Sequence, residues 1–373
     1  MTASSKLFSP LKIGHSDLQH RVIMAPMTRL RCDDDWTPTD MVKEHYVQRA
    51  SVPGTLIFTE GVHISKRFIG LSNVGGIWSS EQIAAWKEIT DAVHEKGSFI
   101  WCQLWTMGRG STWDLAEKVG TKVFAPSPIP LSTSPDKIPT EMTKADIQTL
   151  IDDYVQAAKN CMEAGFDGIH LHAANGHLID QFLQDITNKR TDEYGGSIEN
   201  RSRLAVQVLQ ALVDAIGADR VGVRFSPWGL YGEVGMPDPV PQFSHVIRET
   251  SKLKLAFLDM VEPLTVDGEG VETEEARNDV MVKEWTCGTP VILSGGFMPD
   301  SAKARVDGDK EHEVAITFGR YFTSNPDLPF RIRENLELTP YNRPTFYTPL
   351  NSVGYTDWPA SPEFLAAQKE QRV

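Results

Sequence analysis

Short apolar runs recur along the chain, and each is followed by a turn and then by a stretch with the apolar spacing of a helix. Because the runs are apolar on both faces, they are typical of parallel strands covered by helices. Repeated units of this kind predict an α/β fold, the TIM (β/α)8 barrel, with residues 1–373 as a single domain. The predicted strands cover residues 21–25, 55–59, 98–105, 168–173, 221–226, 257–261, 290–294 and 315–318.

The clearest helix signal lies in residues 144–165, where apolar side chains recur at intervals of three and four positions. We expect this apolar stripe to pack against the barrel. Thr143 followed by Asp146, and Ser79 followed by Gln82, have the spacing of capping boxes at helix starts. Both pairs therefore predict that a helix begins at the next residue.

Two segments do not fit the repeat. Residues 106–141 follow the third strand and are rich in Pro and Ser, and they are too long for an ordinary loop between a strand and a helix. We expect this segment to form a lid above the barrel. Residues 336–373 are too rich in aromatic side chains to be disordered, so we expect this C-terminal tail to pack over the barrel mouth.

Polar and glycine residues gather where the predicted strands end. The C-terminal strand ends of a TIM barrel form its active face, so this placement predicts an enzyme. Glycines after the seventh and eighth strands favour a phosphate site, because they let backbone N–H groups approach an anion, and an arginine there adds a charged donor. The strand-end residues are Pro26, Met27, Thr28, Glu60, Gly61, Gln103, His172, Asn175, Arg224, Glu262, Gly295, Gly296, Gly319 and Arg320.

Four of these side chains indicate the chemistry. His172 and Asn175 lie three residues apart and can both donate to one oxygen, as a carbonyl or oxyanion site requires. The amide of Gln103 offers a donor and an acceptor, and the cation of Arg224 can stabilise a delocalised anion. A flavin ring system needs this combination. The alternative for Arg224 is a buried ion pair with one of the strand-end acids, Glu60 or Glu262.

The net charge of −13 argues against a nucleic acid or an anionic membrane as the partner, since both require a basic surface. No segment approaches the roughly 20 apolar residues of a membrane span, and the N-terminus lacks the apolar core of a signal peptide. We expect a cytoplasmic protein that acts on a small molecule. The four cysteines form no CxxC pair, so neither a disulfide framework nor a metal site is expected.

Over essentially its whole length the chain resembles the old yellow enzyme family of FMN-dependent ene-reductases. Several family motifs stand in order, at residues 24–29, 59–61, 103–105, 172–176, 190–201, 224–227 and 318–320. The fungal branch of secondary metabolism, which includes ergot-alkaloid chanoclavine-I aldehyde reductases and isomerases, is similar at residues 20–21, 48–55 and 321–330.

The resemblance implies the reduction of the C=C bond of an α,β-unsaturated carbonyl compound by a monomer or homodimer. FMN would be bound, and NADPH or NADH would be the transient hydride donor. His172 and Asn175 would hold the substrate oxygen, and the walls of the substrate pocket would be Trp105, Tyr231, Phe297 and Tyr347. The flavin ring would contact Pro26, Met27, Thr28, Gly61, Gln103, His172 and Arg224, and its phosphate would contact Gly295, Gly296, Gly319 and Arg320.

One position departs from the family pattern. Family reductases usually carry a proton-donating tyrosine two residues after the asparagine, where this chain has His177. Imidazole has a reference pKa of about 6.5, against about 10 for phenol, and is largely neutral at neutral pH. Three interpretations stay open: His177 donates the proton, solvent donates it, or the net reaction is isomerisation or desaturation.

Two further alternatives lie outside flavin reduction. Glu60 and Glu262 are two acids at strand ends, and such a pair could serve as acid and nucleophile in a flavin-free barrel hydrolase. A binding protein that kept the barrel without catalysis is the other alternative, because a fold does not dictate a function.

Overall fold

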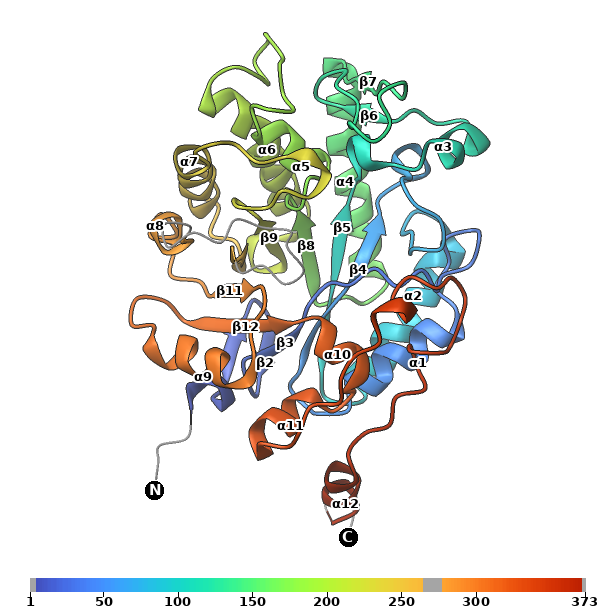
Figure 1. Ribbon diagram of the computed structural model, residues 1–373, viewed down its shortest axis with the longest axis vertical. Coiled ribbons are helices and arrows are strands. Elements are labelled where there is room, and N and C mark those ends of the chain that lie inside the picture. Colours follow the sequence, from blue (N-terminus) through green and yellow to red (C-terminus); the bar gives the residue numbers. More distant parts are fainter. Residues whose placement is uncertain (1–4, 264–276, 371–373) are drawn as a thin grey trace.

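A closed barrel of eight parallel strands forms the centre of the molecule, as the apolar runs predict (Figure 1). The computed structural model describes residues 5–263 and 277–370. The barrel closes where the last strand pairs in parallel with the first, with Thr317 opposite Ile23. In chain order the strands are β3 (Val22–Met24), β4 (Leu56–His63), β5 (Phe99–Trp105), β8 (Gly168–His172), β9 (Val221–Phe225), β10 (Phe257–Val261), β11 (Val291–Ser294) and β12 (Val314–Phe318).

Helices surround the barrel and cover its outer face (Figure 1). The capping boxes at Thr143 and Ser79 are both present, and α4 and α2 begin directly after them, as expected. Among the described residues, no helix is long and apolar enough to cross a membrane. The helices are α1 (Asp40–Arg49), α2 (Ser80–His94), α3 (Trp113–Val119), α4 (Lys144–Glu163), α5 (Leu178–Leu183), α6 (Ile198–Ile216), α7 (Val240–Ser251), α8 (Asp279–Val282), α9 (Pro299–Gly308), α10 (Arg320–Ser324), α11 (Leu328–Glu334) and α12 (Pro362–Glu370).

A small antiparallel hairpin packs against the apolar side chains inside the barrel. Its strands are β1 (Leu11–Ile13) and β2 (Ser16–Leu18), and the apolar side chains of both belong to one buried cluster with Trp101 and Phe257 from the barrel strands. The indole Nε1 of Trp101 donates to Oγ of Ser16 at 3.1 Å. Because Phe257 begins β10, this cluster lies at the N-terminal end of the barrel, and the C-terminal end is left for the site.

Strand β4 runs longer than the sequence predicts. The expected strand ends at Thr59, whereas the observed one continues to His63 through a register shift between Phe58 and Gly61. Such a bulge bends a strand and re-aims its side chains. Here it sets Gly61 opposite Gln103 of β5, at the barrel mouth.

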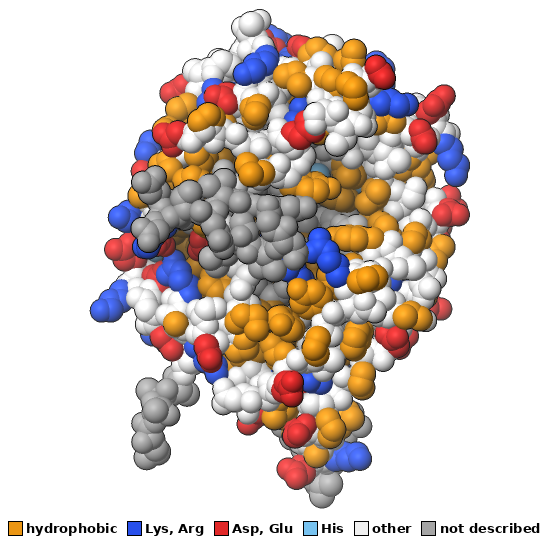
Figure 2. Space-filling view, in the orientation of Figure 1, with side chains coloured by type: hydrophobic (Ala, Val, Ile, Leu, Met, Phe, Trp, Pro, Cys, Tyr) orange, Lys and Arg blue, Asp and Glu red, His pale blue; other side chains and the backbone are white. Residues whose placement is uncertain are grey.

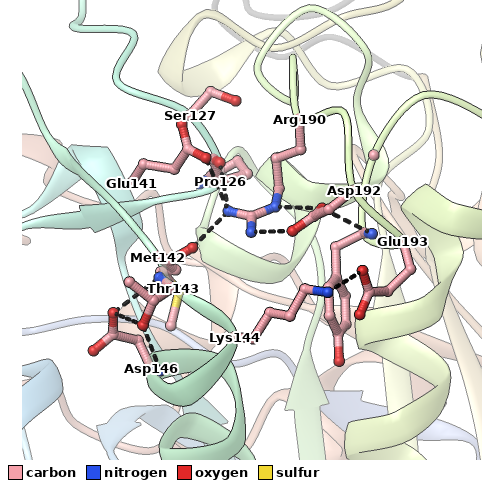
Figure 3. A network of polar contacts seen from close by, with 12 residues as sticks. Pro126, Ser127, Glu141, Met142, Thr143, Lys144, Asp146, Arg190, Asp192 and Glu193 are labelled. Carbon is pink, nitrogen blue, oxygen red and sulfur yellow. Dashed lines mark hydrogen bonds and ion pairs between the residues drawn. The ribbon is translucent and has the colours of Figure 1, made fainter.

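The insertion of residues 106–141 contains α3 and the short strands β6 (Phe124–Ala125) and β7 (Thr140–Glu141), and it packs beside α4 and α5 (Figure 1). Arg190 joins this insertion to the following motif (Figure 3). Its guanidinium donates to the carbonyl oxygens of Pro126 and Met142 at 3.1 and 2.6 Å, and to the carboxylate of Asp192 at 3.0 and 2.6 Å. The family motif that begins at Arg190 therefore holds the insertion in place.

Two arginines that follow β3 hold the described part of the C-terminal tail, residues 336–370. Arg31 donates to the carbonyl oxygen of Phe346 at 2.7 Å, and Arg29 donates to that of Gly354 at 2.8 Å. The guanidinium carbons of Arg29 and Arg31 also lie 5.1 and 4.8 Å from the ring centre of Tyr355. These contacts bring the aromatic part of the tail to the edge of the barrel mouth.

Candidate active site

A cavity of about 560 Å³ opens at the C-terminal ends of the barrel strands. In Figure 2 the same face of the molecule is hollowed near its centre, and hydrophobic side chains border the hollow. All the residues that the sequence predicts as flavin contacts line this cavity: Pro26, Met27, Thr28, Gly61, Gln103, His172, Arg224, Gly295, Gly296, Gly319 and Arg320.

A second cavity of about 720 Å³ adjoins the first. Asn175, His177 and Trp105 line both cavities, so they form part of a shared wall. Other walls of the second cavity are mostly apolar and aromatic, as is typical of a small-molecule site. They include Leu30, Leu71, Met107, Trp228, Leu230, Tyr231 and Tyr347.

The predicted substrate-pocket residues divide unequally. Trp105 and Tyr347 line both cavities, and Tyr231 lines the second. Phe297 lines neither cavity, because its half-buried ring packs against the hydrophobic core of the barrel. Its neighbour Met298 lines the first cavity instead.

A tight turn after β8 presents the predicted oxygen-binding pair. The backbone N–H of Asn175 donates to Oγ of Ser226 at 2.6 Å, which fixes the turn to the end of β9. Asn175 and Gly176 both have left-handed backbone conformations, with φ of 55° and 67°. Asparagine and glycine are the residues that adopt this conformation most readily, so the local sequence explains the turn.

Gly176 also allows a second loop to approach the turn. A Cβ atom at this position would lie 2.1 Å from the carbonyl oxygen of Tyr231.

Gly176→Ala is therefore expected to destabilise the protein by more than the ~1–2 kcal/mol of a left-handed alanine, because the Tyr231 loop must also move. Urea unfolding measures this cost. Gly196→Ala is the matched control, because Gly196 has φ of 81° and open space around its Cβ direction, and equal costs would contradict the contact.

His172 and His177 lie against each other and against Trp105. Their ring centres are 4.6 Å apart, and Trp105 stacks on His172 at 6.2 Å. Burial lowers the pKa of His177 to about 4 and that of His172 well below its usual range, so both rings are neutral at neutral pH. Nδ1 of His172 is buried and has no hydrogen-bond partner among the described residues.

The tautomer of neutral His177 follows from its one polar contact. Nδ1 lies 3.2 Å from the carbonyl oxygen of Ala174. A carbonyl oxygen can only accept, so Nδ1 carries the hydrogen and Nε2 has the free lone pair. In this form His177 offers the cavity an acceptor, which does not favour the interpretation that it donates the proton.

Arg224 forms an ion pair, but with a residue that the sequence analysis did not select. Its Nη1 lies 3.1 Å from Oδ2 of Asp259 on β10, and its Nη2 donates to Oγ of Ser294 at 3.0 Å. The suggested pairing with Glu60 or Glu262 is wrong, because the Glu60 carboxylate accepts from the backbone N–H of Arg29 and Glu262 lines the second cavity. The sequence does mark Asp259 as unusual, since it is an acid within an otherwise apolar strand.

The cavity has free hydrogen-bonding groups that fit FMN. Nε of Arg224 is buried without a hydrogen-bond partner among the described residues, and so is Nε1 of Trp105. At the other end Gly295 and Gly296 turn with φ of 124° and 60°, and Gly319 precedes α10. Cationic Arg320 lines the cavity there, as expected for the phosphate end. These residues would hold FMN along the line from Gln103 to Arg320.

The C-terminal tail contributes cavity residues, although the sequence predicts only that the tail packs over the barrel mouth. Tyr341, Arg343 and Phe346 line the first cavity, together with Arg29. The aromatic composition of the tail was the available signal, whereas nothing in the local sequence singles out Arg343. Arg343 thus joins Arg29, Arg224 and Arg320 among the arginines that line this cavity.

The two acids of the hydrolase alternative do not face a common cavity. Glu60 is 1% exposed, and its carboxylate accepts from the backbone N–H of Arg29 at 3.4 Å. Glu262 lines the second cavity, whereas Glu60 lines neither. A pair of catalytic carboxylates must flank one substrate bond, so this arrangement does not support hydrolysis.

Comparisons with known proteins agree with the geometry. Residues 6–339 match the NADH:flavin oxidoreductase / NADH oxidase family. The aldehyde reductase FrzD of a Cladobotryum species is 47% identical and is aligned over 98% of this chain and 97% of that protein. The chanoclavine-I aldehyde reductase fgaOx3 of Penicillium roqueforti is 45% identical over 97% and 98%. The probable inactive reductase easA of Epichloe festucae var. lolii is also 45% identical, over 100% and 99%.

Solved structures show the same relationship. An old yellow enzyme from Pichia sp. AKU4542 superposes with a TM-score of 0.88 at 36% identity, covering 96% of this chain and 94% of that one. The homologue from Zymomonas mobilis also gives 0.88, at 38% identity over 95% and 100%. Barrel, cavity and sequence agree, so the chain belongs to the NADH:flavin oxidoreductase / NADH oxidase family and is an FMN-dependent oxidoreductase of the old yellow enzyme type, with NADH or NADPH as hydride donor.

Proposed function

We propose that the enzyme reduces the C=C bond of an α,β-unsaturated carbonyl compound, with FMN in the first cavity and the alkene in the second. The observation that carries this proposal is the position of His172 and Asn175, where an imidazole and an amide meet the cavities at the end of β8. When bound, FMN supplies the hydride that it has received from the nicotinamide. The chain itself must orient the alkene and withdraw electrons from it.

His172 and Asn175 provide that withdrawal. A neutral imidazole and a side-chain amide each hold one N–H toward a ligand oxygen without the cost of burying a charge. Negative charge develops on the carbonyl oxygen as hydride reaches the β-carbon, so both hydrogen bonds strengthen in the transition state. The stacked ring of Trp105 limits how His172 can turn.

An aldehyde is the form of carbonyl that we favour. Two relatives of this chain are named aldehyde reductases. The second cavity has the indole rings of Trp105 and Trp228 and the phenol of Tyr231 around it, which suits a bulky apolar group attached to the enal. We propose that residues 106–141 close this cavity as a lid, since Arg109 donates to the carbonyl oxygen of Gly232 at 2.8 Å.

Protonation of the α-carbon is assigned to solvent. Neutral His177 carries its hydrogen on Nδ1, which donates to the carbonyl oxygen of Ala174. Only the imidazolium could therefore donate a proton from Nε2. With a pKa of about 4, that form falls tenfold for each unit of pH above this value. A donor role would therefore make alkene reduction fall steeply with rising pH, whereas the proposal predicts no such fall between about pH 6 and 8.

His177→Tyr tests this assignment directly. A phenol at this position introduces a proton donor, and such donors typically contribute about 10²–10⁴ in rate, so the substrate half-reaction is expected to accelerate by at least ~10-fold. Stopped-flow measurement of flavin reoxidation by an enal gives this rate. His177→Phe is the matched control, which is expected to stay near the wild-type rate. A loss of rate in His177→Phe would identify His177 as the donor.

Isomerisation is a second candidate, because an unprotonated Nε2 at the cavity is a poor proton source for net reduction. In that reaction the substrate would accept hydride from the reduced cofactor and give it back after rotation about the former C=C bond, so no NADPH would be consumed in net turnover. Product analysis after incubation with a geometrically pure enal separates the two: reduction gives the saturated aldehyde, and isomerisation gives the other alkene isomer.

The main experiment is an anaerobic titration. The yellow holoenzyme is expected to lose its flavin absorbance on addition of NADPH or NADH and to recover it on addition of enals, enones or nitroalkenes. Comparing the two nucleotides also defines the preferred donor. Failure of every activated alkene to restore the absorbance would refute the proposal while leaving the flavin assignment intact.

A further inference from the structure

A layer of polar side chains crosses the barrel just below the cavity. Gln103, His170, Arg224 and Asp259 come from the four neighbouring strands β5, β8, β9 and β10. Gln103 is directly opposite His170 in the strand register, and Arg224 is opposite Asp259. Gln103 and Arg224 line the cavity, whereas His170 and Asp259 are completely buried beneath it.

The contact between His170 and Gln103 determines which ring nitrogen of His170 carries the hydrogen. Nε2 of the Gln103 amide lies 3.3 Å from Nδ1 of His170. An amide nitrogen can only donate, so Nδ1 is the acceptor and the ring hydrogen is on Nε2. That Nε2 lies 3.3 Å from Oδ2 of Asp259, a distance at which the carboxylate favours the N–H electrostatically, although the two groups are not aligned as a hydrogen bond. Burial lowers the pKa of His170, which keeps the ring in this neutral form.

The surroundings hold this arrangement in place. The ring of His170 packs against Phe58 and Phe257, with centroid distances of 4.3 and 5.3 Å. Arg224 contacts the same oxygen of Asp259, Oδ2, at 3.1 Å. His170 therefore has little freedom to rotate, and the opposite tautomer would set two N–H groups against each other at Gln103.

We propose that His170 is a positioning residue that fixes the side-chain amide of Gln103 with its nitrogen toward the barrel interior and its oxygen toward the flavin cavity. The Gln103 contact sets the tautomer of His170, and the nearby carboxylate of Asp259 favours the same tautomer by its charge. A primary amide has one acceptor oxygen and one donor nitrogen, so its orientation decides which of the two the cavity offers. His170 thus determines the hydrogen bonding of FMN without touching it.

The inference depends on FMN binding and not on the reaction proposed for the alkene. Its test can therefore fail while alkene reduction holds, and the reverse is also true. The readout is the dissociation constant of FMN, measured by the fluorescence of flavin released when the holoenzyme is diluted.

His170→Leu and His170→Gln form the matched pair of variants. Leucine removes the acceptor, so the Gln103 amide loses its fixed orientation and FMN is expected to bind about 10-fold more weakly, the effect of one hydrogen bond. Glutamine can accept from Gln103 at one end and donate to Asp259 at the other, so it is expected to bind FMN within about 3-fold of the wild type. Equal weakening in both variants would overturn the proposal.

A double-mutant cycle separates positioning from general damage to the barrel. In a Gln103→Ala background there is no amide to orient, so His170→Leu is expected to change FMN affinity by less than about 2-fold. An undiminished 10-fold effect in that background would show that His170 acts independently of Gln103. Urea unfolding of each variant confirms that the compared proteins are folded.

A measurement on the wild type keeps the inference testable if His170→Leu does not fold. In protein labelled with ¹⁵N-histidine, the two ring nitrogens of a neutral imidazole have well-separated NMR shifts. The His170 signals, assigned by their loss in His170→Gln, are expected to show a protonated Nε2 and an unprotonated Nδ1. A protonated Nδ1 would overturn the proposal.

Discussion

His172→Ala is expected to lower the rate of alkene reduction by about 10²–10³ while the enzyme keeps its FMN, because one of two donors to the developing oxyanion is lost. His172 is buried beside Trp105 and His177, so the alanine leaves a space in the lining of the first cavity without disturbing an ion pair. Single-turnover reoxidation of the reduced enzyme by an enal measures the effect directly.

Two comparisons make the His172→Ala result specific. In the nicotinamide half-reaction the carboxamide oxygen gains no negative charge as hydride leaves, so NADPH oxidation in the absence of alkene is expected to fall much less than alkene reduction. Asn175→Ala removes the partner donor and is expected to give a loss of similar size. If His172→Ala reduced enals at the wild-type rate, the oxygen-binding role of the imidazole would have to be abandoned.

Arg224→Met is expected to destabilise the FMN-free protein by about 3–5 kcal/mol, because it leaves the carboxylate of Asp259 buried without its counter-charge. Asp259 is 0% exposed, and Arg224 contacts it at 3.1 Å. Methionine keeps much of the side-chain volume, so the loss reports the charge and not a cavity. Urea unfolding of protein stripped of FMN gives the free energy.

The matched control for Arg224→Met is the double variant with Asp259→Asn. Its neutral amide removes the unpaired charge, so most of the lost stability is expected to return. FMN affinity is expected to stay low in both variants, because each lacks the guanidinium at the cavity. A double variant as unstable as the single one would show that the ion pair is not the cause.

The barrel and its active face could be predicted from the sequence because both depend on local patterns. Apolar runs define the strands, and a parallel barrel brings all their C-terminal ends to one face, so residues such as Thr28, Gln103 and Arg320 converge without further information. The bulge in β4 has no such local pattern, since a register shift depends on the neighbouring strand. Phe297, predicted as a pocket wall, lines neither cavity for a similar reason: an aromatic residue beside a site can equally well pack against the core.

The sequence by itself determined the fold, the family and the residues at the barrel mouth. Each strand and its C-terminal end can be recognised from a local apolar run, and a parallel barrel brings those ends to one face. Only the tertiary structure decided how those residues are paired. It showed that Arg224 pairs with Asp259, that His170 accepts from Gln103, and that Nδ1 of His177 donates a hydrogen bond to the carbonyl oxygen of Ala174. Such pairings join different strands or depend on the turn of a backbone, and tautomers follow from them, so their chemistry is fixed by distance in space and not by position in the chain.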